Sequence, residues 1–319
     1  MEKPELLVVP RLPDWDLDAL AERFTLHRLF EVAAPDRAAF LAAHGPTIRA
    51  IATNGEIGAD AALMGAMPQL SIVACYGVGV DAIDRAYCAS RGIPVTNTPD
   101  VLTEDVADMA FALLLAAARR IPEADRWVRE GRWAAQGAMP LTTRVWGRRL
   151  GIVGLGRIGR AVARRAEAFR MPVAYTARAA KPDLPYGFHP DPTSLAAAVE
   201  VLVCCTTGGA ETEGLISRAA IEALPPGAIF VNVSRGTVVD EPALLEALRS
   251  DRIALAGLDV FRDEPNINAE FARLPNVVLA PHAASGTVET RKAMGALMRE
   301  NLEAHFAGRP LLTPLPPPD

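Results

Sequence analysis

Three residues in the C-terminal third, Arg235, Glu264 and His282, have side chains suited to chemistry on a charged organic molecule. Each follows a separate apolar run: AIFVNV at 228–233, IALAGLDV at 253–260 and NVVLA at 276–280. An arginine binds a carboxylate with two parallel hydrogen bonds. A histidine titrates near neutral pH and can donate a proton, and a neighbouring carboxylate favours its protonated form. We expect the three to meet, because the carboxyl ends of parallel strands form a ligand crevice.

A glycine-rich segment in the middle of the chain, GIVGLGRIGRAVA at 151–163, has the spacing of a dinucleotide-binding loop. Gly154, Gly156 and Gly159 form a G-x-G-x-x-G pattern between an apolar run and an alanine-rich helical segment. Such glycines permit a tight turn, a close approach of the backbone to a pyrophosphate, and packing of the helix on the strand. The alternative is a glycine turn in a cofactor-free α/β fold. The context favours a dinucleotide whose pyrophosphate lies at the helix N-terminus.

The charge that follows this loop predicts which dinucleotide binds. About 20 residues after such a loop, NAD-binding enzymes place an acidic residue that accepts hydrogen bonds from the ribose 2′-hydroxyl. Here the charged residue is Arg178, with Thr176 before it and Lys181 after it. A guanidinium cannot accept a hydrogen bond, but it can donate two to a 2′-phosphate, and Thr176 can donate another. The sequence therefore predicts NADP(H) in preference to NAD(H); the alternative is an arginine solvated on a loop.

Parallel strands must position these residues, and the chain supplies two series of short apolar runs. Continuous apolar runs between helical patterns are typical of parallel strands that are buried on both faces. The first series lies at 6–9, 48–52, 71–75 and 94–97, and the second at 150–154, 172–175, 201–205, 228–233, 253–260 and 276–280. We therefore predict an α/β protein with two doubly wound parallel-sheet domains.

The predicted domains are discontinuous in the sequence. A helix over about 102–120 follows the first series and is expected to cross to the second domain. The helical segment at 289–308 has no place in a six-stranded nucleotide-binding fold, so we expect it to return to the first domain. The predicted substrate domain is thus 1–99 with 286–319, and the predicted nucleotide-binding domain is 100–285.

The composition of the chain argues against several classes of binding partner. The chain of 319 residues has a net charge of −5 and no basic block, which argues against nucleic acid or anionic membranes. Its first residues lack the features of a signal peptide, and the longest apolar stretch, 106–118, is too short to span a bilayer. We therefore expect a cytoplasmic location. The four cysteines have neither pairing nor metal-binding spacing, so we expect reduced thiols and no metal. The proline-rich end, 311–319, is expected to be extended.

Several segments together identify a family resemblance. They are YGVGVDAID, GIVGLGRIG, NVSRGTVVDE, GLDVFRDEP and PHAASGTVETR. In this order they resemble the motifs of the D-isomer-specific 2-hydroxyacid dehydrogenases, and the resemblance covers the chain from about residue 45. Segments 140–169 and 301–315 further resemble the glyoxylate/hydroxypyruvate and hydroxyphenylpyruvate reductases, a group that favours NADPH. The resemblance implies a Rossmann nucleotide-binding domain and a flavodoxin-like substrate domain, with the active site in the cleft between them.

The resemblance also implies a role for each matching residue. His282 would be the acid/base, Glu264 its partner and Arg235 the substrate clamp. The main-chain N–H groups of Val78 and Gly79 would receive the substrate carboxylate. The other implied contacts are Ser285 beside the substrate, Asp259 at the nicotinamide carboxamide and, elsewhere on the cofactor, Gly154, Gly156, Arg157, Ile158, Gly159, Thr176, Arg178 and Cys205.

The implied activity (EC 1.1.1.-) is NADPH-dependent reduction of small 2-oxoacids, glyoxylate and hydroxypyruvate, to 2-hydroxyacids, with His282 as the general acid. Reduction of arylpyruvates such as hydroxyphenylpyruvate is an alternative, because the loop TNGEIG at 53–58 is expected to decide the substrate size. A dinucleotide-sensing scaffold, like the corepressors that share this fold and polar triad, is an alternative from another class. The resemblance also implies a homodimer, joined through the nucleotide-binding domain and an arm around residues 120–145.

Overall fold

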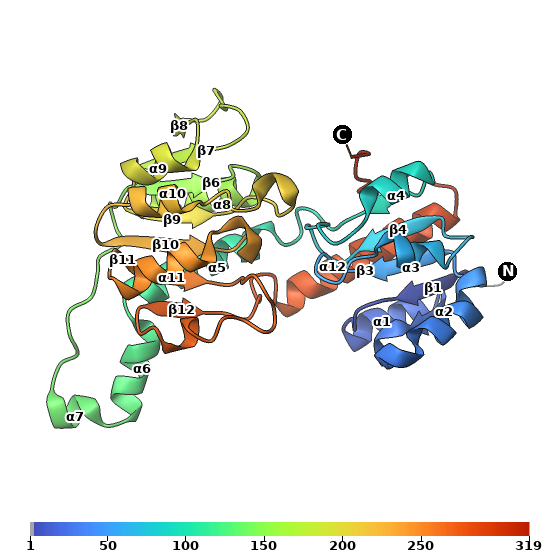
Figure 1. Ribbon diagram of the computed structural model, residues 1–319, viewed down its shortest axis with the longest axis horizontal. Coiled ribbons are helices and arrows are strands. Elements are labelled where there is room, and N and C mark those ends of the chain that lie inside the picture. Colours follow the sequence, from blue (N-terminus) through green and yellow to red (C-terminus); the bar gives the residue numbers. More distant parts are fainter. Residues whose placement is uncertain (1–2, 319) are drawn as a thin grey trace. The chain divides into compact units, whose positions relative to one another are not determined.

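The computed structural model describes residues 3–318, which form two compact units, each built on a parallel sheet (Figure 1). Unit 1 comprises the chain up to Leu102 and from Gly286 onward, and unit 2 comprises Thr103–Ser285. The predicted α/β class with two parallel-sheet domains is confirmed. The first boundary lies at 102/103 and not at the expected 99/100, because the first helix of unit 2 begins at Thr103.

In the described part of unit 1, five strands form a sheet in the order β2–β1–β3–β4–β5, which is the flavodoxin-like order. The strands are β1 Glu5–Val8, β2 Thr25–Arg28, β3 Ala50–Thr53, β4 Ile72–Cys75 and β5 Val95–Thr96. The helices are α1 Asp14–Ala21, α2 Arg37–His44, α3 Ala61–Gly65, α4 Arg85–Ser90 and α12 Val288–Phe306. Every residue of β3 and β4 is buried, as continuous apolar runs predict.

The C-terminal end of the chain is fixed to unit 1. Helix α12 packs against α1 and β4. Beyond it, the proline-rich segment is described up to residue 318, and Asp319 lies outside the described residues. This segment pairs antiparallel with β5: Pro314 bridges Thr96, and the Leu315 N–H donates to the Val95 carbonyl at 2.8 Å. The segment is extended, as predicted, and it continues the edge of the sheet.

In the described part of unit 2, seven parallel strands follow the order β12–β11–β10–β9–β6–β7–β8. The strands are β6 Leu150–Val153, β7 Val173–Thr176, β8 Gly187–His189, β9 Val201–Cys204, β10 Ala228–Asn232, β11 Ile253–Leu258 and β12 Val277–Leu279. Six of these strands have the Rossmann order, and β12 extends the sheet by one. The structure adds β8 to the six predicted strands, because this short edge strand, GFH, has no continuous apolar run.

The helices of unit 2 are α5 Thr103–Ala118, α6 Ile121–Arg129, α7 Arg132–Gln136, α8 Arg157–Ala168, α9 Pro192–Ala198, α10 Arg218–Ala223 and α11 Glu241–Arg249. Helix α5 was expected to cross between domains, but it lies wholly in unit 2 and packs on α8, β10 and β11. Its face toward α8 carries Glu104, which binds Arg164 at 2.6 Å and Arg165 at 2.8 Å. Among the helices of residues 3–318, none has the length and apolar character needed to cross a membrane.

Side-chain caps define where several helices begin. Asp60, Asp84, Asp191 and Asp240 each precede a helix and accept a hydrogen bond from a main-chain N–H of its first turn. Such caps stabilise a helix by about 1 kcal/mol because they satisfy donors that have no intrahelical partner. Helix α8 differs, because Gly156 precedes it and provides no side-chain cap. The helix N-terminus, which favours anions, therefore carries no capping side chain.

Candidate active site

Three adjacent strands of unit 2 bring the predicted polar residues to one edge of the sheet. Strand β11 pairs in parallel with both β10 and β12. Arg235 follows β10, Glu264 follows β11 and His282 follows β12. The carboxyl ends of the three strands therefore place these residues on neighbouring loops, although they are far apart in the sequence.

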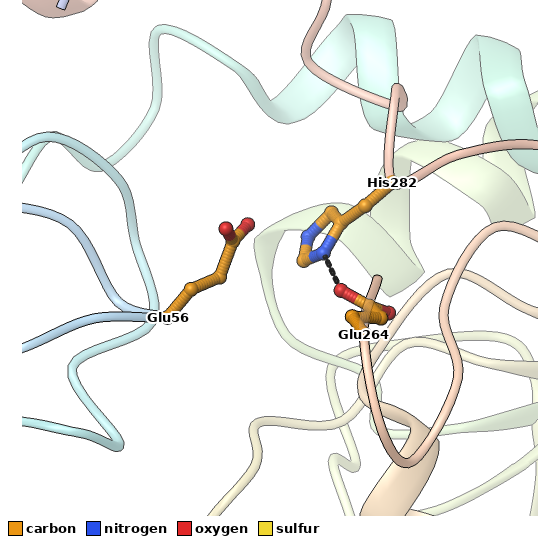
Figure 2. A group of neighbouring side chains, drawn as sticks. All are labelled: Glu56, Glu264 and His282. Atoms are coloured by element: carbon orange, nitrogen blue, oxygen red, sulfur yellow. Dashed lines mark hydrogen bonds and ion pairs between the residues drawn. The ribbon is translucent and has the colours of Figure 1, made fainter. Parts of the chain in front are cut away.

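His282 and Glu264 form a short hydrogen-bonded pair, which Figure 2 shows. The imidazole Nδ1 lies 2.6 Å from Oε2 of Glu264, and the two side chains are 27% and 25% exposed. The other carboxylate oxygen, Oε1, accepts the main-chain N–H of Phe261 at 2.6 Å. Because both oxygens are held, the carboxylate fixes the orientation of the imidazole ring. Nδ1 is occupied by this bond, which assigns any proton donation to Nε2.

The surroundings of Glu264 keep it ionised at neutral pH. Burial raises the pKa of the Glu264 carboxyl, but this effect is outweighed by hydrogen bonds from His282 and from the Phe261 N–H. The positive charges of His282 and Arg235 also lower the pKa, so that it lies below the usual value. An ionised carboxylate next to Nδ1 favours the imidazolium form of the ring. The pair is therefore suited to general acid chemistry.

Asp259 shapes the turn that carries His282. Its two carboxylate oxygens accept the main-chain N–H groups of Ala283 at 2.8 Å and Ala284 at 3.0 Å. Its carbonyl accepts the N–H of His282, which has a φ of +50°. A non-glycine residue adopts such a φ only when its surroundings hold it there. The Asp259 side chain is fully buried and already bonded in this way, and its contact with the nicotinamide carboxamide stays a prediction.

Asn232 organises the loop that carries Arg235, and sequence reasoning did not single it out. Its side-chain Oδ1 accepts the N–H and the hydroxyl of Ser234, at 3.0 and 2.8 Å, and its Nδ2 donates to the Arg235 carbonyl at 3.0 Å. The Arg235 Nη1 donates to the carbonyl of Ser234 at 2.8 Å. The signal that could have identified Asn232 is a polar residue that ends a wholly apolar strand, where it is only 2% exposed.

The glycine-rich loop has the geometry that a dinucleotide pyrophosphate requires. Gly154 has a φ of +92°, and a Cβ there would lie 2.7 Å from the main chain of Thr206. A Cβ on Gly159 would lie 2.2 Å from the Gly154 carbonyl oxygen, whereas a Cβ on Gly156 would meet nothing within 4 Å. Two glycines therefore let the loop and helix α8 pack closely, and the third leaves open space at the helix N-terminus. The predicted main-chain donors Arg157 and Ile158 are the first two residues of α8.

The residues predicted around the adenosine differ in accessibility. Arg178 is exposed just beyond β7, and no partner for it is found among residues 3–318. Thr176 is buried, and its carbonyl accepts the Gly154 N–H at 2.9 Å, which ties β7 to the glycine-rich loop. Cys205 follows β9 and is partly exposed; burial raises the pKa of its thiol to about 12, so it is a neutral group.

The predicted substrate residues outside the triad lie at loop positions. Val78 and Gly79 follow β4 in unit 1, and both are partly exposed. Ser285 is the last residue of unit 2 and is also partly exposed. In the loop at 53–58, the Asn54 side chain accepts the Ile57 N–H at 2.8 Å, and the Thr53 hydroxyl donates to the Gly58 carbonyl at 2.6 Å. These bonds give the loop a defined turn.

Comparison with known proteins agrees with this geometry. The sequence model of one protein family, the D-isomer specific 2-hydroxyacid dehydrogenase NAD binding domain, matches residues 111–284 of this chain. A glyoxylate/hydroxypyruvate reductase of Arabidopsis thaliana is 45% identical over 99% of this chain and 100% of its own. A hydroxyphenylpyruvate reductase of Plectranthus scutellarioides is 48% identical over 93% of this chain and 94% of its own. An NADPH-dependent glyoxylate/hydroxypyruvate reductase of Sinorhizobium meliloti, solved with NADP and malonate, is 42% identical, with a TM-score of 0.91 over 98% of this chain and 97% of its own.

Proposed function

Because the chain belongs to the D-isomer-specific 2-hydroxyacid dehydrogenase family, we propose that it reduces the small 2-oxoacids glyoxylate and hydroxypyruvate to 2-hydroxyacids with NADPH. The observation that carries the proposal is the pairing of His282 with Glu264 at the edge of the sheet that also bears the glycine-rich loop. The similarity to the Arabidopsis and Sinorhizobium reductases supports the choice of substrates and of cofactor.

The glycine-rich loop would hold the cofactor, whose reduced nicotinamide supplies the hydride when bound. The N–H groups of Arg157 and Ile158 would bind the pyrophosphate where Gly156 leaves space. The guanidinium of Arg178 would donate to a 2′-phosphate of the adenosine ribose. Cys205 lies next to the loop, since its N–H donates to the Val153 carbonyl at 2.9 Å, and it would contact the cofactor as an uncharged thiol.

The oxoacid would be bound through its carboxylate. Arg235 donates a two-pronged hydrogen bond to this group, and the N–H groups of Val78 and Gly79 donate to it as well. These bonds fix the carbonyl carbon in one orientation, and the positive charge of Arg235 polarises its C=O bond. Ser285 would lie beside the bound acid.

The proton comes from His282. As the carbonyl carbon is reduced, negative charge develops on its oxygen, and Nε2 of the imidazolium gives that oxygen its proton. The C=O double bond becomes a C–O single bond, the product is a hydroxyl, and the imidazole is left neutral. Glu264 stays ionised throughout and holds Nδ1, so the same nitrogen faces the substrate in each turnover.

Initial rates with paired cofactors and substrates test the function. NADPH and NADH oxidation would be followed with glyoxylate, hydroxypyruvate and phenylpyruvate under the same conditions. Fast NADPH oxidation with the two small acids is expected. Tight NADPH binding without turnover of any of the three acids would contradict the proposal and favour the dinucleotide-sensing scaffold.

Arg178→Ala is expected to lower kcat/KM for NADPH by about 10- to 150-fold, because a hydrogen bond to a charged phosphate is lost. The value for NADH should not change, since the 2′-hydroxyl offers no comparable partner. Steady-state kinetics with both cofactors measure the effect, and Lys181→Ala, which removes a nearby cation, is the control. An unchanged ratio of NADPH to NADH efficiency in Arg178→Ala would show that NADPH preference does not come from Arg178.

Glu264→Gln is expected to shift the pH profile of reduction to lower pH. Reduction needs protonated His282, and the ionised Glu264 favours that form, so the rate of the native enzyme falls as the histidine deprotonates on raising the pH. Without the carboxylate, this fall should begin about one pH unit lower, or more. Profiles of kcat/KM against pH check this. Glu213→Gln, an exposed carboxylate of unit 2 that pairs with Arg262, should leave the profile unchanged; an identical profile for Glu264→Gln would contradict the pairing.

Reduction of arylpyruvates is the second candidate function. The hydroxyphenylpyruvate reductase of Plectranthus scutellarioides is 48% identical to this chain, which is slightly more than the Arabidopsis glyoxylate/hydroxypyruvate reductase. The substrate panel above separates the two, because a higher kcat/KM for phenylpyruvate than for glyoxylate would favour the aryl substrates.

The proposal includes a homodimer and a cytoplasmic location. In unit 2, helices α6 and α7 form an arm that extends away from the sheet (Figure 1). The arm and the segment that follows it expose large apolar side chains, with Val128 58%, Trp133 64% and Leu141 99% exposed. Exposed apolar side chains of this size support association with a second copy, which sedimentation of the purified protein tests. All four cysteines are free thiols, which supports a cytoplasmic location.

A further inference from the structure

The loop at 76–80, which would receive the substrate carboxylate, is fixed through its carbonyl groups. The Gly77 carbonyl accepts the main-chain N–H of Thr98 at 2.9 Å. The Val78 carbonyl accepts the side-chain Nδ2 of Asn97, also at 2.9 Å. All of these residues lie in unit 1. Cys75 Sγ also donates to the Gly79 carbonyl, at 3.3 Å. At the Gly77 and Val78 carbonyls only the bond from Asn97 comes from a side chain, so a substitution of Asn97 alters the anchorage of these two peptide units.

These bonds decide where the N–H groups of the loop point. A trans peptide unit is planar, and its C=O and N–H point in opposite directions. The Gly77 carbonyl shares a unit with the N–H of Val78, and the Val78 carbonyl shares one with the N–H of Gly79. Drawing both carbonyls toward residues 97–98 therefore turns both N–H groups to the opposite side. Within residues 3–318, neither N–H has an acceptor, which fits two donors kept for a ligand.

Asn97 is itself held by the C-terminal segment of the chain. Asn97 directly follows the last residue of β5, Thr96, and is 7% exposed. Its carbonyl accepts the Thr313 hydroxyl at 2.6 Å, and its N–H donates to the Thr313 carbonyl at 3.4 Å. Thr313 therefore binds both main-chain polar groups of Asn97, its carbonyl and its N–H. The hydrogen bonds between Asn97 and Thr313 therefore link the loop at 76–80 to the C-terminal segment of the chain.

Thr313 is in turn fixed by a fully buried amide on α12. Asn301 is 0% exposed, and its Nδ2 donates to the Thr313 hydroxyl at 2.9 Å and to the Leu297 carbonyl at 2.8 Å. Its Oδ1 accepts the N–H groups of Leu312 and Thr313, at 3.0 and 3.1 Å. The amide thus makes all four hydrogen bonds that its donors and acceptors allow. A buried network in which every group is satisfied holds a single geometry.

We propose that Asn97 is a positioning residue that aims the N–H of Gly79 at the substrate carboxylate, and that Asn301 and Thr313 hold Asn97 for this purpose. The C-terminal segment is then part of the support of the substrate site, in addition to being the edge of a sheet. This inference rests on the proposed function, because it assigns the carboxylate of the oxoacid as the group that the loop receives.

Asn97→Asp tests the proposal, because it keeps the shape of the side chain and replaces the donor toward the Val78 carbonyl by an oxygen. Because Asp can also add a negative charge that repels the substrate carboxylate, the uncharged variant Thr313→Val separates loss of positioning from this charge effect. We would compare kcat/KM for glyoxylate and for its methyl ester, which lacks the carboxylate charge. Asn97→Asp is expected to raise KM for glyoxylate by about 5- to 30-fold and to lower the acid-to-ester ratio of kcat/KM by a similar factor. The dissociation constant of NADPH should not change. A general loss of structure would lower kcat/KM for both substrates by the same factor and leave their ratio unchanged.

Two further variants make the outcome decisive. Asn276→Asp is the matched control, because Asn276 also donates its Nδ2 to a main-chain carbonyl, that of Leu248 at 3.0 Å, but does so in unit 2. It should leave the acid-to-ester ratio unchanged. Thr313→Val removes only the hydroxyl that binds Asn97 and should lower the ratio in the same direction by a smaller factor. If thermal unfolding shows that Asn97→Asp does not fold, the acid-to-ester ratio of Thr313→Val tests the proposal in its place.

The possible results separate this proposal from the proposed function. Native enzyme that reduces glyoxylate, together with variants whose acid-to-ester ratio is unchanged, would overturn the positioning role and leave the function standing. Native enzyme that reduces neither glyoxylate nor hydroxypyruvate would overturn the function, and the positioning role would fall with it. A lowered ratio in Asn97→Asp and Thr313→Val, but not in Asn276→Asp, would support both.

Discussion

His282→Ala is expected to lower kcat for oxoacid reduction by about 10²–10⁴-fold, the range for loss of a general acid. The imidazole is held at Nδ1 by Glu264 at 2.6 Å, and the turn that carries it is fixed by the carboxylate of Asp259. The rate depends on this proton because negative charge develops on the carbonyl oxygen as its carbon is reduced. KM for the oxoacid and the dissociation constant of NADPH should change little, since neither binding step needs the proton.

Single-turnover and steady-state rates measure this loss. His305→Ala is the matched control: His305 is also partly buried and hydrogen-bonded, to Ser71 at 2.9 Å, but it lies in unit 1 on α12. That variant should keep the native kcat. A loss of less than tenfold in His282→Ala would remove His282 from the acid role. Restoration of part of the rate by added imidazole would support the role, because a free acid could then replace the missing side chain.

Arg235→Ala is expected to lower kcat/KM for glyoxylate by at least about 10²-fold, because two charge-assisted hydrogen bonds to the substrate carboxylate are lost. We expect changes in both KM and kcat. KM should rise because the carboxylate loses its partner, and kcat should fall because Arg235 also orients the substrate and polarises its carbonyl. The pKa of the Glu264 carboxyl should also rise in this variant, because the positive charge of Arg235 helps to lower it in the native protein.

Arg235→Lys distinguishes charge from geometry. A lysine keeps the positive charge but cannot make the planar two-pronged bond, so its kcat/KM should lie between those of the native enzyme and of Arg235→Ala. NADPH binding, measured by fluorescence titration, should be the same in all three proteins. Native values of both KM and kcat in Arg235→Ala would refute the proposed clamp.

Much of the fold could be predicted from the sequence because its signals are local. Strands such as β6 and β10 are continuous apolar runs, which burial on both faces of a parallel sheet requires. The two strands that the runs do not reveal, β2 and β8, lie at the edges of their sheets, where they are partly exposed and need no apolar run. The helix at 102–120 was recognised from its pattern, but its place in unit 2 depends on packing against α8 and β11.

The sequence by itself determined which residues can do chemistry. Gly154, Gly156 and Gly159 were recognised by their spacing and by their place between an apolar run and a helical segment. The close approach of Gly154 to Thr206, which lies far along the chain, is visible only in the structure. Arg235, Glu264 and His282 were recognised by their types and by their positions after apolar runs. In a parallel sheet those positions lie at one edge, whatever the strand order.

Only the tertiary structure decided how these residues are held. The bonds of Asp259 to the His282 turn, of Asn232 to the Arg235 loop and of Asn97 to the Val78 carbonyl cannot be read from any local pattern. Each is made by a side chain of a common polar type, which acquires its partner from the turn geometry around it. The link from Asn97 through Thr313 to Asn301 joins segments about 200 residues apart, because burial leaves polar groups only the partners that folding brings to them.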